Sequence, residues 1–242
     1  MHSHQWTLTS VLTILFAMQS GASNAEPRIG TAASTRPSVE AVAGGNTQTL
    51  SAGSEIYANQ TVRTGNRGMA DLVFLDKTNL SVGPTSEVRL DKFVYDPTGS
   101  SGSVALQATR GAFRFVTGSQ AKHAYQVSTP HGTLGVRGTT VEVVLQPTKD
   151  ESGRECVAKY RLAEGAGATL TLPSGEVKNM SDIGSCICVH RDGTATAGNC
   201  PSSILAFSVG GPPPPPPPPP AGGGGGGGCT NSCSTPPAGP LR

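Results

Sequence analysis

The chain has 242 residues, with 18 Lys and Arg against 16 Asp and Glu and a formal net charge of +2. This balance argues against a nucleic-acid partner, because nucleic-acid-binding proteins usually carry a basic stripe. The 32 glycines and the Val, Thr and Ser spread through the chain favour strands and turns over helices.

The first 25 residues resemble a secretory signal peptide. Residues 11–18 form an apolar run, and Ser23 and Ala25 supply the small side chains that a signal peptidase requires. The run is shorter than the ~20 apolar residues that span a bilayer. A buried N-terminal helix is the alternative, and the lack of alternating polar residues disfavours it. We expect cleavage after Ala25, a periplasmic or secreted location, and no transmembrane segment in the mature chain.

Alternating side chains predict strands over most of the mature chain. Residues 26–37 are polar and short of large apolar side chains, so we expect a flexible leader there. Further on, small groups of apolar residues recur with a period of two: Ala70, Leu72 and Phe74; Val88 and Leu90; Val104 and Leu106; Val141, Val143 and Leu145; Ala168, Leu170 and Leu172. A period of two places these side chains on a core face and their neighbours toward water. Closely spaced Gly and Pro leave no room for a ten-residue helix, so we predict an all-β fold. The pattern suits a sandwich, a barrel or a solenoid equally.

Composition divides the mature chain into three parts. We expect a β-domain over residues 38–147, a cysteine-containing β-extension over residues 148–208, and a low-complexity tail over residues 209–242. The tail contains nine consecutive prolines at 212–220 and seven consecutive glycines at 222–228. Polyproline forms an extended rod and polyglycine a flexible coil, and neither can bury a core. The tail is therefore predicted to be a disordered spacer.

The cysteines lie late in the chain, which favours disulfides in an exported protein. They are Cys156, Cys186, Cys188, Cys200, Cys229 and Cys233. The first four can pair in three ways, and the last two follow the spacer. A zinc site of Cys186, Cys188, His190 and Cys200 is the alternative. We expect no metal, because zinc-binding cysteine pairs usually have two or more residues between them.

Short motifs in a fixed order resemble the FecR family. They run from the Thr64-Gly65 turn through residues 70–86, 111–115 and 125–130 to residues 134–139, and the resemblance spans about residues 56–145. The residues that carry the motifs are Gly65, Asp76, Gly83, Pro84, Gly111, Pro130, Arg137, Gly138 and Thr139. Lys77 departs from the family, which commonly has Gly in this turn. The resemblance implies a periplasmic or secreted β-domain with a twisted, solenoid-like architecture.

The motif residues favour structural roles over a ligand site. Residues 135–139 form a Gly-rich loop that contains Arg137, but a strand follows where a phosphate-binding loop needs a helix. We expect the glycines to permit a bulge or a close approach of two chain segments. The Arg137 guanidinium is expected to bind turn carbonyls or a carboxylate, with Asp71, Asp76 and Glu142 as candidate partners.

Neither catalytic residues nor a cofactor site can be identified. No G-x-S-x-G elbow occurs, and the Gly-rich segment at 165–167 also precedes a strand, which excludes a dinucleotide fingerprint. Two functions stay open. One is an envelope binding or scaffold module that recognises a protein or a glycan. The other, which the resemblance implies, is a component of FecR-type signal transduction that works with a separate membrane protein.

Overall fold

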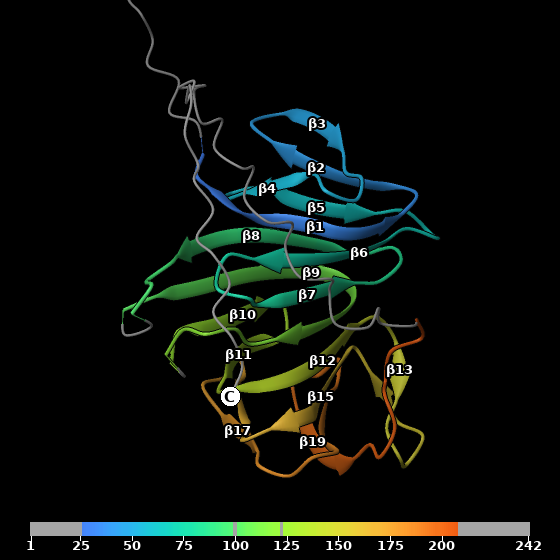
Figure 1. Cartoon of the computed structure of the whole chain (residues 1–242). Helices are drawn as coiled ribbons and strands as arrows, with labels where there is room; N and C mark the ends of the chain where they lie inside the picture. Colours follow the sequence, from blue (N-terminus) through green and yellow to red (C-terminus); the bar gives the residue numbers. More distant parts are fainter. Residues whose placement is uncertain (1–25, 99–100, 122, 208–242) are drawn as a thin grey trace, which may run out of the picture.

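The computed structural model describes residues 26–98, 101–121 and 123–207 (Figure 1). The predicted signal peptide, the tail and its Cys229 and Cys233 lie outside these residues. No helix occurs among them, so none could cross a membrane, and the all-β prediction is confirmed. The strands are β1 (Arg28–Arg36), β2 (Val39–Ala43), β3 (Asn46–Thr49), β4 (Glu55–Tyr57), β5 (Thr61–Thr64), β6 (Met69–Phe74), β7 (Asn79–Val82), β8 (Glu87–Val94), β9 (Ser103–Val116), β10 (Tyr125–Thr129), β11 (Gly132–Val136), β12 (Thr139–Leu145), β13 (Thr148–Lys149), β14 (Glu155–Cys156), β15 (Ala158–Gly165), β16 (Ala168–Thr171), β17 (Val177–Met180), β18 (Ser185–Val189) and β19 (Ala195–Asn199).

Seventeen strands form one hydrogen-bonded network that folds over into two stacked layers. Sheet A has the order β4-β1-β6-β7-β9-β12-β15-β18-β19. Sheet B has the order β3-β2-β5-β8-β9-β10-β11-β16-β17. The long strand β9 belongs to both sheets, and its pairing with β10 is parallel whereas the other pairings are antiparallel. The result is an elongated sandwich whose strands stack in a solenoid-like row (Figure 1).

The motif glycines lie where the chain passes between the sheets. Gly65, Gly83 and Gly138 lie in the β5–β6, β7–β8 and β11–β12 connections, and Gly111 is the bend inside β9. Gly111 has φ +94° and lies against Ser86, so a side chain would be strained and would collide with Ser86. Gly111 thus marks a close approach of two chain segments, whereas at Gly138 a side chain would meet no atom within 4 Å and only the φ of +60° favours glycine.

The core lies between the two sheets and follows the predicted alternation. Leu72, Val88, Val104, Val141 and Leu170 are all fully buried. In β12, however, all seven residues are buried, including those expected to face water. The reason is a further layer over the outer face of sheet A. Residues 200–207, which we call the C-terminal strap, run back from β19 along sheet A (Figure 1). The Phe207 ring lies against Gly83, at the end of β7.

The expectation of a flexible leader at residues 26–37 is wrong. Residues 28–36 form β1, which pairs with both β4 and β6 near one end of sheet A. Ile29 and Ala32 are buried, and Gly30 lies directly against the β6 backbone. The side chains at these positions are small because the β6 backbone is close, and a segment of small residues resembles a linker in the sequence.

The extension at residues 148–208 is continuous with the preceding strands. β15 pairs with β12 on one side and β18 on the other, and β16 pairs with β11 in sheet B. The predicted boundary after residue 147 therefore does not separate two layers or two cores. Hydrophobic residues on both sides of it belong to the same buried cluster.

Candidate functional site

A row of polar side chains crosses sheet A from strand to strand. Register partners place them directly opposite one another, in the order Asp71, Ser81, Arg114, Glu142, Arg161 and Cys186. Charges alternate along the middle of the row, so each ionic side chain has an opposite charge or a hydroxyl beside it. The row leads from the middle of the sandwich to the cysteines at its C-terminal end.

Glu142 and Arg161 form a buried ion pair that holds the strap. The Arg161 Nη1 to Glu142 Oε2 distance is 3.2 Å, and the two side chains are 9% and 4% exposed. The same guanidinium donates to the carbonyl oxygens of Cys200 (2.6 Å) and Pro201 (3.3 Å). Glu142 accepts from the Ile204 backbone N–H (3.0 Å). The pair thus satisfies backbone groups of a segment that has no sheet partner.

Two disulfides close this end of the molecule. Cys156 is bonded to Cys188 and Cys186 to Cys200, which is one of the three connectivities open from the sequence. Such bonds form and persist in oxidising compartments outside the cytoplasm. The Cys186–Cys200 bond fixes the start of the strap, while the Cys156–Cys188 bond joins β14 to β18.

A cavity of about 250 Å³ lies beside the two bonds. Its walls include Asp150, Glu151, Lys159, Cys186, Cys188 and Cys200. The volume is below the range of roughly 300–1,000 Å³ typical of drug-sized ligands, so it suits an ion or one small group. Asp150, Glu151 and Lys159 are the charged residues of this wall, and the Lys159 ammonium donates to the Lys149 carbonyl (2.8 Å).

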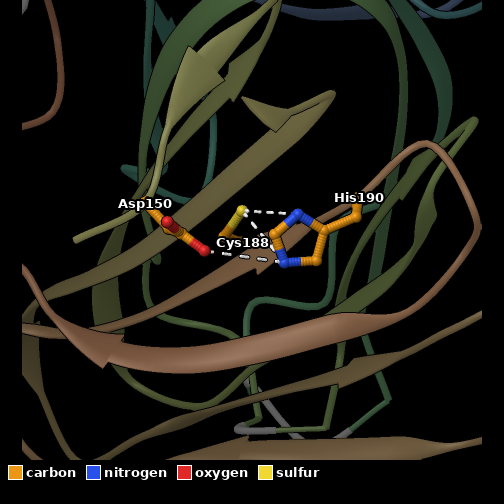
Figure 2. Close-up of side chains that lie close together, drawn as sticks. All are labelled: Asp150, Cys188 and His190. Carbon is orange, nitrogen blue, oxygen red and sulfur yellow. Dashed lines mark hydrogen bonds and ion pairs between the residues drawn. The ribbon is translucent and has the colours of Figure 1, made fainter. Parts of the chain in front are cut away.

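Three potential metal ligands meet at the edge of this cavity. Figure 2 shows the Asp150 carboxylate and the Cys188 sulfur directed at the His190 ring. Hydrogen bonds hold the pKa of the Asp150 carboxyl below its usual range, and the bond from the Ser152 hydroxyl has the largest effect. The zinc set considered from the sequence is not assembled, because Cys186 and Cys200 are bonded to each other.

Asp76, one of the motif residues, organises a buried network. Its carboxylate accepts hydrogen bonds from the Thr78 backbone N–H (3.0 Å), the Thr78 hydroxyl (2.8 Å) and the Tyr125 hydroxyl (3.0 Å). Tyr125 in turn accepts from the Gln120 backbone N–H (2.8 Å). Burial, followed by the negative charge of Asp76, raises the pKa of Tyr125 to about 12. The network joins the β6–β7 turn to β10 and is structural in character.

The expectation for Arg137 is wrong. Its side chain is exposed and forms no ion pair with any of the described residues. The proposed carboxylate partners are already satisfied: Asp71 binds Ser34 and Ser81, and Asp76 and Glu142 have the partners given above. Within residues 26–98, 101–121 and 123–207, the hydrogen bond of Arg137 runs from its backbone N–H to the Gly167 carbonyl (3.3 Å).

The remaining motif residues mark turns and corners. Pro84 follows Gly83 in the β7–β8 connection, and Pro130 lies in the β10–β11 turn. Thr139 begins β12, where its hydroxyl donates to the Glu164 carbonyl and its backbone N–H donates to the Thr117 hydroxyl (2.9 Å). These contacts connect β12 to both of its neighbours in sheet A.

Removing the Cys156–Cys188 bond by a double substitution to alanine should lower the free energy of unfolding by about 2–4 kcal/mol, because the closed loop restricts the unfolded chain. Urea unfolding of the oxidised proteins measures this difference. Cys186→Ala with Cys200→Ala should cost about 3 kcal/mol or less, since that loop is shorter. A stability independent of reductant would contradict both values.

Comparison with known proteins found one family model and two solved structures that are similar to this chain. The family model described as "FecR protein" matches residues 60–177, which extends past the expected end at residue 145. Two crystal structures of a "putative anti-sigma factor" from Parabacteroides distasonis ATCC 8503, at 1.65 and 2.50 Å resolution, are similar to this chain. Each has 14% identity and a TM-score of 0.44, and the match covers 58% of this chain and 59% of that one, less than two thirds of its length. No curated protein matches the sequence.

Proposed function

Because residues 60–177 of this chain form a FecR domain, we propose that the protein is an exported, non-enzymatic module that binds a partner protein of the cell envelope. The family match carries the proposal, since the FecR resemblance implies a periplasmic or secreted β-domain of the kind used in envelope signalling. The matched segment spans the sandwich from the start of β5 to the start of β17. It contains the motif corners and the Asp76 network, and the ionic side chains described above serve structural contacts.

The free edge of sheet B supports binding of a partner strand. Within the part of the chain that the structure describes, β3 pairs only with β2, and it is exposed throughout and carries no charge. The Leu50 backbone N–H donates to the Val39 carbonyl (2.9 Å). Since hydrogen-bonded and non-hydrogen-bonded pairs alternate along an antiparallel ladder, the backbone groups of Thr47 and Thr49 point to the open side. An extended segment of a partner can add there as a further strand.

The other three edges carry features that discourage strand addition. β4 has an ion pair between Arg28 and Glu55 (3.2 Å), and β17 has Lys178 bound to Glu176 (2.7 Å). On β19 the Glu151 carboxylate accepts from the backbone N–H of Asn199 (3.0 Å) and thereby caps the edge. β3 has no comparable charge or cap among its own residues, which favours it as the binding edge.

Thr47→Pro should weaken partner binding about tenfold or more, because it removes an outward N–H and leaves the β2–β3 hydrogen bonds in place. The partner would be captured by cross-linking the full chain in intact envelopes and identified by mass spectrometry. Thr47→Val is the matched control, since it keeps the N–H and should retain the partner. Equal recovery with the proline variant, or recovery of a glycan in place of a protein, would contradict the proposal.

FecR-type signal transduction is the second candidate, and the same family match favours it. The chain would then act with a separate membrane protein to change transcription. Comparing transcripts of neighbouring transporter and sigma-factor genes with and without the gene tests this role. Unchanged transcript levels would exclude the signalling role and would not bear on the proposal of partner binding.

Export through residues 1–25 belongs to the proposal. Intact-mass and N-terminal analysis of the protein recovered from the envelope fraction should give Glu26 as the first residue. A cytoplasmic product that begins at Met1 would contradict export by this segment.

A further inference from the structure

His190 has the orientation of a metal-binding histidine. Its ring is buried, and Nδ1 lies 2.7 Å from the Glu155 carbonyl, which can only accept a proton. Nδ1 therefore carries the hydrogen, and the Nε2 lone pair accepts a hydrogen bond from the Thr196 hydroxyl (3.0 Å), which a bound metal ion would replace. Nε2 lies 3.7 Å from the Cys188 sulfur and 3.7 Å from Asp150 Oδ2. Metal-binding histidines are usually held in this way, with the other ring nitrogen donating to a carbonyl or carboxylate.

The Asp150 carboxylate is also held with one oxygen directed into the cluster. Its Oδ1 accepts from the Ser152 backbone N–H (3.0 Å), the Ser152 hydroxyl (2.7 Å) and the Arg154 backbone N–H (2.9 Å). Oδ2 takes no part in these bonds and faces the His190 ring (Figure 2). The β13–β14 turn thus fixes the carboxylate before any ligand arrives.

The Cys156 sulfur is bonded to Cys188, next to the cluster of Asp150, Cys188 and His190, and would supply a fourth donor once that bond is reduced. The Cα atoms of Cys156 and Cys188 are 5.4 Å apart, and the Asp150, Cys188 and His190 donor atoms lie within 4.8 Å of one another. Zinc bonds of roughly 2.0–2.3 Å in a tetrahedron place neighbouring donors roughly 3.3–3.8 Å apart. The separations of 3.7 Å from His190 Nε2 to the Cys188 sulfur and to Asp150 Oδ2 fall in this range.

We propose that, once the Cys156–Cys188 bond is reduced, Cys156, Cys188, His190 and Asp150 bind one Zn²⁺ ion. A dithiol reductant breaks the S–S bond and becomes a disulfide itself, which leaves two thiols on the protein. Zn²⁺ then replaces the two thiol protons, which pass to solvent, and binds both thiolates, His190 Nε2 and Asp150 Oδ2. Two sulfurs, a nitrogen and an oxygen form a donor set that Zn²⁺ accepts in tetrahedral geometry.

The cavity supplies an entry path, because Asp150 and Cys188 belong to its wall. The site is also gated by oxidation: forming the disulfide removes two of four ligands and releases the ion. A disulfide and a zinc ion therefore fasten the same strands, β14 and β18, in the two redox states. This inference is independent of partner binding at β3, which lies at the other end of the sandwich (Figure 1).

The test uses the full chain with Cys186, Cys200, Cys229 and Cys233 changed to Ser, which leaves only the proposed cysteines. After reduction, it should bind one Zn²⁺ per chain, and Co²⁺ should give thiolate charge-transfer and tetrahedral d–d absorption. Reoxidation should release the ion. His190→Ala should weaken Zn²⁺ binding by at least about 100-fold, beyond the 10–100-fold effect of losing an outer contact.

Two further variants distinguish the proposed site from adventitious binding of the metal by free thiols. Asp150→Asn keeps the shape of the side chain and should weaken the affinity while leaving the Co²⁺ thiolate bands. The reverse variant, with Cys156 and Cys188 changed to Ser and the other cysteines kept, should lack the tetrahedral spectrum. Failure of the reduced protein to bind metal, or equal binding by the His190→Ala or the reverse variant, would overturn the proposal. Circular dichroism of the oxidised proteins checks folding in each case.

Discussion

Replacing Arg161 with methionine is expected to lower the free energy of unfolding by about 3–5 kcal/mol, because the Glu142 carboxylate would stay buried without its cation. The change also removes the donors to the Cys200 and Pro201 carbonyls, so the strap loses contacts at its start. Urea unfolding of the oxidised protein measures the loss. The only tryptophan, Trp6, lies in the predicted signal peptide, so far-ultraviolet circular dichroism is the suitable signal.

Two variants show whether burial of the pair is responsible. Arg28 and Glu55 are also 3.2 Å apart but are 47% and 50% exposed, so Arg28→Met should cost less than about 1 kcal/mol. Arg161→Met combined with Glu142→Leu should recover most of the loss, since an apolar pair of similar volume needs no charge compensation. Equal losses for Arg161→Met and Arg28→Met would contradict this account.

The strand pattern and its family were predictable because both depend on local order in the sequence. Alternation identified the core faces of β6, β8, β9, β12 and β16, whose apolar residues lie between the two sheets. Glycine positions identified the corners, since only a residue without a side chain fits at Gly111. The two-layer arrangement could not be deduced, because a period of two describes one strand and does not specify its partner.

The sequence did not predict β1 as a strand, and the packing around β1 explains why. Alternation is detected from large apolar side chains, and β1 buries Ile29, Gly30 and Ala32 in a place where the sheet backbones are close. Its register with β6 extends over the whole of that strand, so backbone hydrogen bonding rather than side-chain volume determines its position. A segment of this kind resembles a linker in the sequence.

The candidate site was only partly predictable. The number and spacing of the cysteines predicted the disulfides at Cys156, Cys186, Cys188 and Cys200 but could not choose the connectivity. That choice depends on β14 lying near the end of β18 and the strap near its beginning. Asp150 was not singled out, since it lies far from His190 in the sequence and meets it only when the fold places the β13–β14 turn beside that ring. A turn of the form Asp-x-Ser, in which the carboxylate binds backbone N–H groups two and four residues later, is the signal that would have drawn attention to it.

Asp76→Ala is expected to lower the free energy of unfolding by about 3–5 kcal/mol. The carboxylate is fully buried and accepts three hydrogen bonds, and a bond to a charged group contributes about 1.5–3 kcal/mol. Bonds that share one carboxylate are not additive, so the total is less than three times that value. The Thr78 N–H and the Tyr125 hydroxyl would lose their acceptor inside the core, and urea unfolding would report the loss.

A cycle with Tyr125→Phe tests whether the network is the cause. Tyr125→Phe removes one bond to Asp76 and should cost about 1–2 kcal/mol, and the double variant should cost less than the sum of the two single changes. Asp91→Ala is the surface control, because Asp91 is 52% exposed in its pair with Arg89 and should cost less than about 0.5 kcal/mol. Strict additivity, or an Asp76→Ala loss as small as that of Asp91→Ala, would mean that the motif aspartate does not hold the β6–β7 turn against β10. A loss confined to the variants of the network would instead explain, from packing and hydrogen bonding alone, why an aspartate occupies this turn.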